Sequence, residues 1–294
     1  MTPIVAEPLR ERAPAKINLD LLVTARRPDG YHELDSLVVF AEAGDMLRLE
    51  EGPGLHLALE GPFAADVPAG EGNLVLRAAR ALEHHLGRDL PGSVVLSKRL
   101  PAASGIGGGS SDAAAMLRGL ARLHRLDVPA PLLAALALKL GADVPVCLAA
   151  RPMRMRGIGE RLEPLADLPG MPLVLVNPRR PVPTKAVFAR MGTPRGPRPR
   201  PALPASATLP DLAAWLGASV NDLEAPALAI EPVIGEVLAA LRRLEGCLLA
   251  RMSGSGATCF GLFTAKDAAD AAAAALAAAR PDWWSIATTA RGCP

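Results

Sequence analysis

The sequence has few aromatic residues and almost no net charge. Phe, Trp and Tyr together make up 3% of its 294 residues, and Tyr31 is the only tyrosine. The 32 basic residues are nearly matched by 30 acidic ones, which leaves a formal net charge of +2. Nucleic-acid-binding surfaces are usually basic and often offer stacking aromatics. We therefore expect no nucleic-acid partner.

Cysteine and long apolar runs are also scarce. The four cysteines are scattered without a C-x-x-C pair, and the five histidines form no H-E-x-x-H motif, so we expect reduced thiols and no zinc site; the cysteines are Cys147, Cys247, Cys259 and Cys293. No apolar run approaches the roughly 20 residues that a membrane-spanning helix needs. The first 16 residues lack the apolar core of a signal peptide. These absences predict a cytoplasmic protein with no membrane partner.

The most informative stretch is rich in glycine and runs from Ser93 to Leu126. A short β-prone run, Val94–Leu96, precedes a loop with four glycines between residues 101 and 109. A helix is then predicted to begin at Ser110, Ser111 and Asp112, because Ser and Asp are the residue types that cap helix starts. Its apolar face is Met116, Leu117, Leu120, Leu123 and Leu126. A glycine turn that enters a helix N-terminus directs free N–H groups and the positive end of the helix dipole at one place. The stretch therefore predicts a phosphate-binding loop.

The two commonest phosphate-binding glycine loops are excluded by the residues that follow. No Gly-Lys-Ser/Thr comes after the glycines, so the loop is not a Walker A motif. Gly105 and Gly107 fit the first two positions of G-x-G-x-x-G, but the third falls on Ser110, which excludes a dinucleotide fingerprint. A serine hydroxyl beside nucleotide phosphates can ligate Mg²⁺.

The string P-x-x-x-G-I-G-G-G-S-S-D-A-A-A resembles the central ATP-binding motif of the GHMP kinases, the family of galactokinase and of homoserine, mevalonate and phosphomevalonate kinases. The resemblance implies that ATP binds to Pro101, Ala102, Ala103, Ser104, Gly105, Ile106, Gly107, Gly108, Gly109, Ser110 and Ser111. It also implies that ATP is the co-substrate and that Ser110 or Ser111 helps to hold Mg²⁺.

Two further segments carry candidate catalytic residues. Lys16, Asn18 and Asp20 alternate with apolar residues in a predicted strand over 13–23, which places the polar three on one face. Asp143 follows a helix that ends at Gly141, and from the residues alone a turn residue that bonds its own backbone is the favoured interpretation. The A-K-I-N and G-A-D-V-P segments resemble family motifs, which implies that Lys16 lies near the acceptor hydroxyl, that Asn18 lies beside the substrate and that Asp143 is the proposed general base.

Tyr31 and His32 follow the turn Pro28–Gly30. From the residues alone, an aromatic at a strand start packs on the core as often as it meets a ligand. The string D-G-Y-H-x-L resembles the branch of the family that phosphorylates a cytidylylated alcohol, in which the tyrosine stacks on cytosine and the histidine bonds to its edge. The same resemblance assigns Thr184 and Phe188 to a cytidine-holding loop, with Phe188 on the opposite face of the base from Tyr31.

The remaining motifs lie in the second half of the chain. Ser253, Gly254, Ser255 and Gly256 resemble the third glycine motif of the family; they are not a G-x-S-x-G nucleophile elbow, because Arg251 stands where the first glycine would be. Three arginines between residues 151 and 156 depart from the family pattern, and the sequence leaves open whether they are exposed or line the nucleotide side. The segment 192–210, rich in Pro and Arg, is expected to be a solvated, mobile loop.

The predicted fold is α+β in two domains. Two alternating runs between residues 45 and 59 predict a hairpin, and a β-prone run, Val144–Leu148, predicts a strand. Helices are expected over residues 73–86, 131–140, 232–243 and 268–280, and strands over 173–177, 259–263 and 284–289. The resemblance implies the GHMP kinase fold, with a ribosomal-protein-S5-like domain over residues 1–160, a ferredoxin-like domain over 161–294 and the active site in the cleft between them.

The function implied by the resemblance is ATP-dependent phosphorylation of the 2-hydroxyl of 4-(cytidine 5'-diphospho)-2-C-methyl-D-erythritol, in the non-mevalonate route to isoprenoid precursors. The expected partner is this small molecule, and the chain is expected to be a monomer or a homodimer. Two alternatives stay open: another GHMP kinase, such as a mevalonate or homoserine kinase, and an RNA-binding module on the S5-like fold. Tyr31-His32 argues against the first, and near-neutral charge with few aromatics argues against the second.

Overall fold

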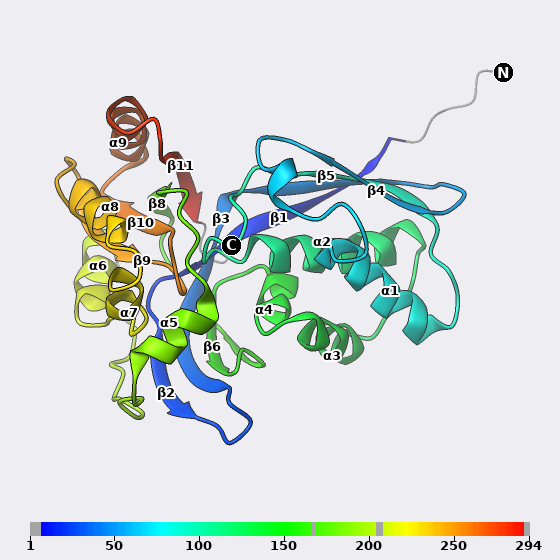
Figure 1. The fold of residues 1–294 in the computed structure, drawn as a ribbon, viewed down its shortest axis with the longest axis horizontal. Coiled ribbons are helices and arrows are strands. Elements are labelled where there is room, and N and C mark those ends of the chain that lie inside the picture. The colour runs from blue at the N-terminus through cyan, green and yellow to red at the C-terminus, as the bar shows by residue number, and fades with distance from the viewer. Residues whose placement is uncertain (1–6, 166–167, 204–207, 291–294) are drawn as a thin grey trace. The chain divides into compact units, whose positions relative to one another are not determined.

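The computed structural model describes residues 7–165, 168–203 and 208–290, and these form two compact units (Figure 1). The first unit takes in the described residues up to Ala13, then Gly44–Ala102 and Gly108–Leu148. The second unit takes in Pro14–Ala43, Ala103–Gly107 and the described residues from Ala149 onward. Each unit is therefore assembled from separate stretches of the chain. The domain boundary predicted at residue 160 stays a prediction.

The first unit is a small sheet with helices. Strand β5 (Gly92–Ser97) lies between two neighbours: it pairs in parallel with β4 (Leu55–Glu60) and antiparallel with the second half of β3 (His32–Glu50). In Figure 1 the helices of this unit lie on one side of those strands. They are α1 (Leu74–Leu86), α2 (Gly108–Leu123), α3 (Ala130–Leu140) and α4 (Val144–Ala149), with a short 3-10 turn, η1, at Ala64–Asp66.

The helix limits follow from the local sequence. Asn73 caps α1 by accepting a hydrogen bond from Val75 N–H at 2.9 Å, and Gly87 ends the helix in the left-handed conformation that glycine adopts most easily. Helix α3 begins just after Pro129 and ends at Leu140. The helices predicted over residues 73–86 and 131–140 are thus confirmed.

The second unit contains two antiparallel groups of strands. In one group, β3 pairs on either side with β2 (Leu22–Arg26) and β6 (Met153–Gly157), and β6 pairs with β7 (Arg161–Pro164). The other has the order β11-β8-β10-β9; these strands are β8 (Met171–Asn177), β9 (Cys247–Met252), β10 (Cys259–Phe263) and β11 (Trp284–Ala290). Strand β3 also joins this second group: Ala41 pairs with Ala290 of β11, and the N–H of Ala43 donates to Thr288 Oγ1 at 2.9 Å.

The core of the second unit forms around β8, all of whose seven residues are buried. Helices pack their apolar residues against this sheet, including Ile234, Val237 and Leu276. The helices are α5 (Thr184–Met191), α6 (Leu209–Gly217), α7 (Glu224–Leu228), α8 (Val233–Arg242) and α9 (Lys266–Ala279). The strands and helices predicted for residues 173–177, 232–243, 259–263, 268–280 and 284–289 are confirmed within one to two residues at each end.

Three local predictions are wrong. The runs between 45 and 59 do not pair as a hairpin, because β5 lies between them. Val144–Leu148 is helical. Pro145 is compatible with this because it lies in the first turn of α4, where a backbone N–H would have no helical acceptor. The predicted strand over 13–23 is interrupted: β1 (Leu9–Asn18) ends at Asn18 and β2 begins only at Leu22.

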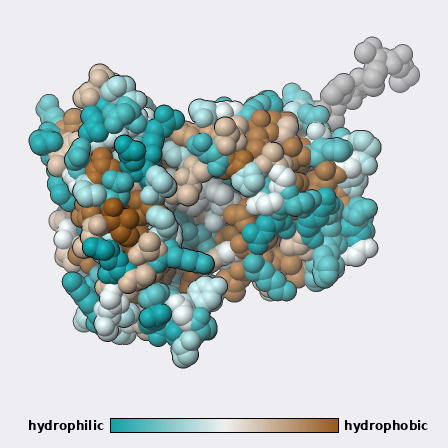
Figure 2. Space-filling model, viewed as in Figure 1, coloured by the Kyte–Doolittle hydropathy of each residue, from teal (hydrophilic) through white to brown (hydrophobic). Residues whose placement is uncertain are grey.

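The surface is mixed in polarity. On the face shown in Figure 2, hydrophilic residues are interspersed with hydrophobic ones. Among the helices described, none is both long enough and apolar enough to cross a bilayer. Of the four cysteines, Cys147, Cys247 and Cys259 are free thiols, and Cys293 lies outside the described residues.

Candidate active site

The glycine loop enters a helix, as predicted, but the helix starts earlier. Helix α2 begins at Gly108, so Ser110, Ser111 and Asp112 lie in its first turns and do not cap it, and Leu126 lies beyond its end at Leu123. The first four N–H groups of a helix have no intrahelical acceptor. Here these N–H groups belong to residues 108–111, two of which are glycines. The helix N-terminus can therefore still bind an anion, but its free N–H donors begin at Gly108 and not at Ser110.

In the second unit the glycine loop packs against the third glycine motif without intervening side chains. A Cβ on Gly105 would lie 2.6 Å from the carbonyl oxygen of Ser253 and 2.7 Å from that of Gly256. A Cβ on Gly254 would lie 2.7 Å from the carbonyl oxygen of Gly105. Real Cβ atoms do not approach that closely, and both glycines have positive φ angles, so only glycine fits at either position.

Hydrogen bonds join the same two segments. The N–H of Thr258 donates to the carbonyl of Ser104 at 3.1 Å, and the hydroxyl of Ser253 donates to the carbonyl of Gly105 at 3.2 Å. The side-chain amide of Asn221 holds the third motif from its other side, by donating to the carbonyls of Met252 and Gly254 at 2.8 Å each.

Lys16 and Asn18 lie on strand β1 against this assembly. Lys16 is 3% exposed, its N–H donates to the carbonyl of Ile106 at 2.9 Å, and a Cβ on Gly107 would lie 3.2 Å from its Cβ and 3.4 Å from its Cε. The N–H of the fully buried Asn18 donates to Ser253 Oγ at 3.1 Å. The predicted polar face of this strand is therefore buried, and it connects the glycine loop with the third glycine motif.

The residues assigned to cytosine are partly brought together. The rings of His32 and Phe188 stack, with centroids 4.6 Å apart and planes at 21°. Partial burial, assisted by the positive charge of Arg26, lowers the pKa of His32 below the ordinary value for histidine. Tyr31 is 57% exposed and adjoins this stack along the chain.

Thr184 begins helix α5, so the segment expected as a cytidine-holding loop is helical from Thr184 to Met191. The Thr184 and Ser255 hydroxyls lie 2.8 Å apart. A candidate substrate residue therefore contacts the third glycine motif.

In the first unit Asp143 lies half-buried immediately before helix α4. Its carbonyl accepts a hydrogen bond from the N–H of Cys147 at 3.2 Å, which is the first helical bond of α4. Asp143 thus occupies a helix N-cap position, which residues of its type favour, and not the turn before a strand that the sequence suggested.

A buried ionic cluster beneath the start of α2 was missed by the sequence reasoning. Lys98 is 1% exposed and bridges two carboxylates, those of Asp45 and Asp112, with 2.8 Å from its Nζ to Asp112 Oδ2. A Cβ on Gly108 would lie 3.1 Å from Lys98 Nζ. Burial raises the pKa of Asp112, the charge of Lys98 opposes this and the charge of Asp45 adds to it, for a value of about 7. One available signal was a lysine that directly follows a buried strand.

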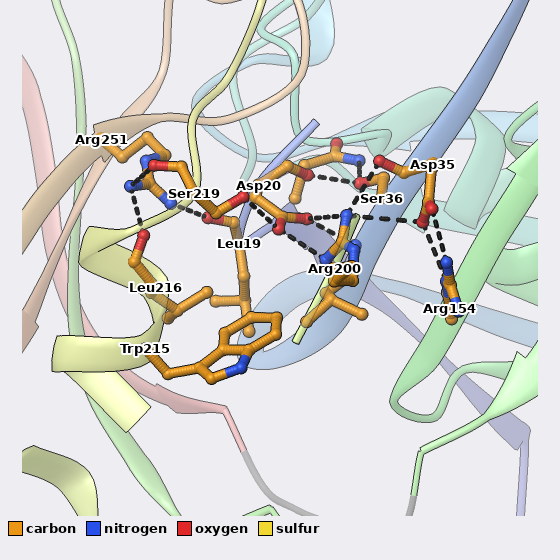
Figure 3. Close-up of polar contacts among 12 residues, drawn as sticks. Leu19, Asp20, Asp35, Ser36, Arg154, Arg200, Trp215, Leu216, Ser219 and Arg251 are labelled. Atoms are coloured by element: carbon orange, nitrogen blue, oxygen red, sulfur yellow. Dashed lines mark hydrogen bonds and ion pairs between the residues drawn. The ribbon is translucent and has the colours of Figure 1, made fainter. Parts of the chain in front are cut away.

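Arg154 and Arg200, one from each of the arginine-rich segments 151–156 and 192–203, take part in a second, largely buried network (Figure 3). Arg154 binds the carboxylate of Asp35 with both ends of its guanidinium, at 2.9 and 2.6 Å. Arg200, whose side chain is 9% exposed, binds the fully buried Asp20 at 2.6 and 3.2 Å. The expectation of a solvated loop is therefore wrong for Arg200, because a buried carboxylate needs a cation. Residues 204–207 of that segment lie outside the described residues.

A cavity of about 660 Å³ lies elsewhere in the second unit. Its lining includes Arg195, Asp222 and Arg242, and none of the residues predicted to bind ATP or substrate. Cations and carboxylates are mixed around it, so its lining favours no one class of ligand.

Comparison with known proteins agrees with the motifs. Residues 73–151 match the GHMP kinases N terminal domain, and residues 202–282 match the GHMP kinases C terminal domain. The chain is 55% identical over 273 residues to a 4-diphosphocytidyl-2-C-methyl-D-erythritol kinase of Cereibacter sphaeroides (strain ATCC 17029 / ATH 2.4.9), covering 92% of this chain and 95% of the relative. It is 52% identical to one of Rhodopseudomonas palustris (strain ATCC BAA-98 / CGA009), covering 97% of this chain and 98% of the relative.

Solved structures agree in fold. A crystal structure of 4-(cytidine 5'-diphospho)-2C-methyl-D-erythritol kinase matches with a TM-score of 0.77 at 40% identity, covering 97% of this chain and 100% of that one. A homoserine kinase from Cytophaga hutchinsonii matches with a TM-score of 0.70 at 18% identity, covering 97% and 95%, which shows the fold alone. The predicted α+β fold with GHMP kinase N- and C-terminal domains is confirmed. With relatives more than half identical along nearly its whole length, the chain belongs to the 4-diphosphocytidyl-2-C-methyl-D-erythritol kinases of the GHMP kinase family.

Proposed function

We propose that the protein transfers the γ-phosphoryl group of ATP to the 2-hydroxyl of 4-(cytidine 5'-diphospho)-2-C-methyl-D-erythritol, giving the 2-phosphate and ADP. The observation that carries this proposal is the identity of 55% to a relative named for that substrate. The reaction belongs to the non-mevalonate route to isoprenoid precursors. A cytoplasmic location and a monomeric or homodimeric state remain predictions.

Phosphoryl transfer requires positioning and charge neutralisation more than covalent help from the protein. The N–H groups of residues 105–111 and the dipole of α2 would hold the phosphate oxygens of ATP. The side chain of Lys16 runs along Gly107, and its ammonium group would stabilise negative charge on the group in transfer. Asp143 would orient the acceptor hydroxyl and take its proton.

Magnesium is expected to accompany ATP in this reaction. Within the described residues no three His, Cys, Asp or Glu side chains cluster as a metal site. Ser111 Oγ, at the start of α2, is buried without a hydrogen-bond partner among the described residues, and Ser110 beside it is half-buried. Such oxygen donors fit a cation that is usually held by few protein groups together with phosphates and water. The ion would neutralise phosphate charge.

Recognition of the cytidine is assigned to the residues around the His32–Phe188 stack. Base stacking on an aromatic ring contributes about 1–3 kcal/mol. The exposed Tyr31, which precedes His32 in the chain, supplies a third ring. A kinase whose substrate has no base would gain nothing from this group of rings.

The proposal is tested by measuring ADP release with ATP and Mg²⁺, with and without the cytidylylated alcohol. We expect release to require that alcohol, and mevalonate and homoserine to give only the background rate. Phosphorylation of mevalonate or homoserine at a comparable rate would overturn the choice of substrate. ATP turnover that ignores all three alcohols would overturn the proposed reaction.

A further inference from the structure

Asn18 carries a buried acceptor that nothing in the described part of the chain uses. Its side chain is fully buried, and its Nδ2 donates to Ser36 Oγ at 2.7 Å. Its Oδ1 has no hydrogen-bond partner among the described residues. A Cβ on Gly254 would lie 3.4 Å from this oxygen, so Oδ1 lies next to the third glycine motif. Buried polar atoms are rarely left unpaired, and each exception calls for an explanation, of which a role in catalysis is one.

The orientation of the Asn18 amide is decided by Ser36. A serine hydroxyl has one proton to donate, and that of Ser36 goes to the carbonyl oxygen of Asp20 at 2.5 Å, because a carbonyl can only accept. Ser36 Oγ must therefore accept from its other neighbour, and only the NH₂ end of the Asn18 amide can donate. These two hydrogen bonds, from Asn18 Nδ2 to Ser36 and from Ser36 to Asp20, leave Asn18 Oδ1 as the unpaired end of the amide, and this oxygen can only accept.

The carbonyl that holds Ser36 is itself held by the Asp20 side chain. This fully buried carboxylate accepts from the N–H of Leu37 at 2.9 Å, from Ser219 Oγ at 2.7 Å and from Arg200 Nη1 at 2.6 Å (Figure 3). The contacts fix the irregular stretch between β1 and β2 at the point where Asn18 ends its strand. Arg200 provides the only cation among these contacts.

Arg200 is anchored in turn by its surroundings. Its Nη2 donates to the carbonyl of Asp35 at 3.2 Å, and its guanidinium lies 5.8 Å from the ring centroid of Trp215. The indole N–H of Trp215 donates to the carbonyl of Ala202 at 3.0 Å, and Arg198 forms an ion pair with Asp222. The Pro/Arg-rich segment is thus fastened on both sides of Arg200.

We propose that Ser36 and Arg200 are positioning residues, which act through Asp20 to keep Oδ1 of Asn18 directed as an acceptor toward a hydroxyl of the alcohol substrate. This inference rests on the proposed function, because the donor it requires is a polyol. An amide turned the other way would present two N–H donors and would not accept that hydroxyl proton. Ser36 thereby contributes to substrate selection without touching the substrate.

The first test compares Ser36→Ala with Ser36→Thr, which keeps the hydroxyl. We expect Ser36→Ala to lower kcat/KM for the alcohol roughly 5- to 150-fold, the range for losing one hydrogen bond to a buried group. The KM for ATP should stay within twofold of wild type, and Ser36→Thr should restore most of the loss. Ser93→Ala, an exposed serine on β5, is the matched control. Equal kcat/KM for the alcohol in wild type and Ser36→Ala would overturn the inference.

A second test uses the substrate. Analogues in which each non-reacting hydroxyl of the methylerythritol is replaced by hydrogen are compared in wild type and Ser36→Ala. One analogue, which lacks the hydroxyl that donates to Asn18 Oδ1, should have a lower kcat/KM than the full substrate in wild type. In Ser36→Ala the same analogue should lose little, because Oδ1 is no longer directed toward that hydroxyl. Strictly multiplicative losses for every analogue would overturn the link between Ser36 and substrate.

Arg200 is tested with Arg200→Lys, which keeps a cation beside Asp20, against Arg200→Met, which removes it. We expect a graded loss of kcat/KM for the alcohol, about fivefold for lysine and larger for methionine, with the KM for ATP unchanged. If Arg200→Met does not fold, the lysine variant alone decides, and wild-type kinetics for it would remove Arg200 from the proposal. Absence of turnover by the wild type itself would count against the proposed function and not against this inference.

Discussion

Gly105 and Gly254 meet backbone to backbone, so the predicted ATP loop and the third glycine motif form one packed assembly. The Cβ that an alanine at 254 would add lies 2.7 Å from the carbonyl oxygen of Gly105. Neither segment therefore has its observed backbone path without the other. Their 149-residue separation in sequence (254 − 105) hides this dependence.

Replacing Gly105 by alanine should abolish this fit. The new Cβ would lie under 3 Å from three backbone atoms, and φ is +78°, so we expect loss of ATP binding together with a destabilisation of about 2 kcal/mol or more. Isothermal titration with a non-hydrolysable ATP analogue and urea unfolding measure the two effects. Gly170→Ala is the control, since a Cβ there meets nothing within 4 Å. Wild-type affinity in Gly105→Ala would show that the close contact does not support the nucleotide loop.

Replacing Asp143 by asparagine should affect turnover and leave ATP binding intact. General-base assistance contributes about 10²- to 10⁴-fold, and asparagine keeps the size and the capping ability of the residue before α4. We expect kcat to fall by that factor with unchanged unfolding and unchanged ATP affinity. A mutant whose kcat lies within a few-fold of wild type would exclude Asp143 from the chemistry.

Removing the Tyr31 ring should weaken the substrate and not the fold. The side chain is 57% exposed, so its deletion costs little packing. Loss of one base-stacking contact of about 1–3 kcal/mol predicts that the KM for the cytidylylated alcohol rises roughly 5- to 150-fold in Tyr31→Ala. Ile286→Ala, another exposed large apolar residue, is the control. Equal KM values for Tyr31→Ala and wild type would remove this ring from the binding site.

Stability should depend on pH through Asp112. Its pKa is raised in the folded state to about 7 from an ordinary value of 3.8, chiefly by burial. The folded protein therefore holds a proton that the unfolded chain has lost, and the free energy of unfolding falls as pH rises from about 4 to about 7. The asparagine in Asp112→Asn does not titrate. The free energy of unfolding of the mutant, minus that of wild type, should therefore rise between about pH 4 and pH 7 and stay constant above pH 7.

The measurement for Asp112 is chemical unfolding of wild type and mutant at pH 5, 6, 7 and 8. Asp127→Asn, which changes an exposed carboxylate, corrects for the general change in charge. Parallel pH profiles for wild type and Asp112→Asn would mean that Asp112 binds no extra proton on folding.

Local patterns predicted much of the fold and the chemical parts of the site. The glycine loop, the third glycine motif and the continuous apolar runs of β8 and β10 are visible as short stretches, because each depends on residues close in sequence. The strand partners were not predictable in the same way. Residues 45–59 look like a hairpin, and only a strand 40 residues later, β5, separates the two runs.

The missed polar residues share one physical reason. Lys98, Asp20 and Arg200 have side-chain types that are usually solvated, and each is buried because its partner comes from a distant part of the chain. The separation between Asp20 and Arg200 is 180 residues. Neither periodicity nor composition reports such pairings. Lys16, by contrast, could be named as a candidate site residue from the sequence, because the A-K-I-N segment resembles a family motif.

The contact of Ala43 with Thr288 has a consequence for synthesis of the protein. The two residues are 245 positions apart, so at about 5–20 residues per second a ribosome makes the second roughly 12–50 seconds after the first. Through that interval β3, which carries Ala43, lacks its partner β11. The nascent chain thus keeps the apolar strand β8 unmatched on one edge until β11 emerges, and this is the period in which chaperone help would matter most.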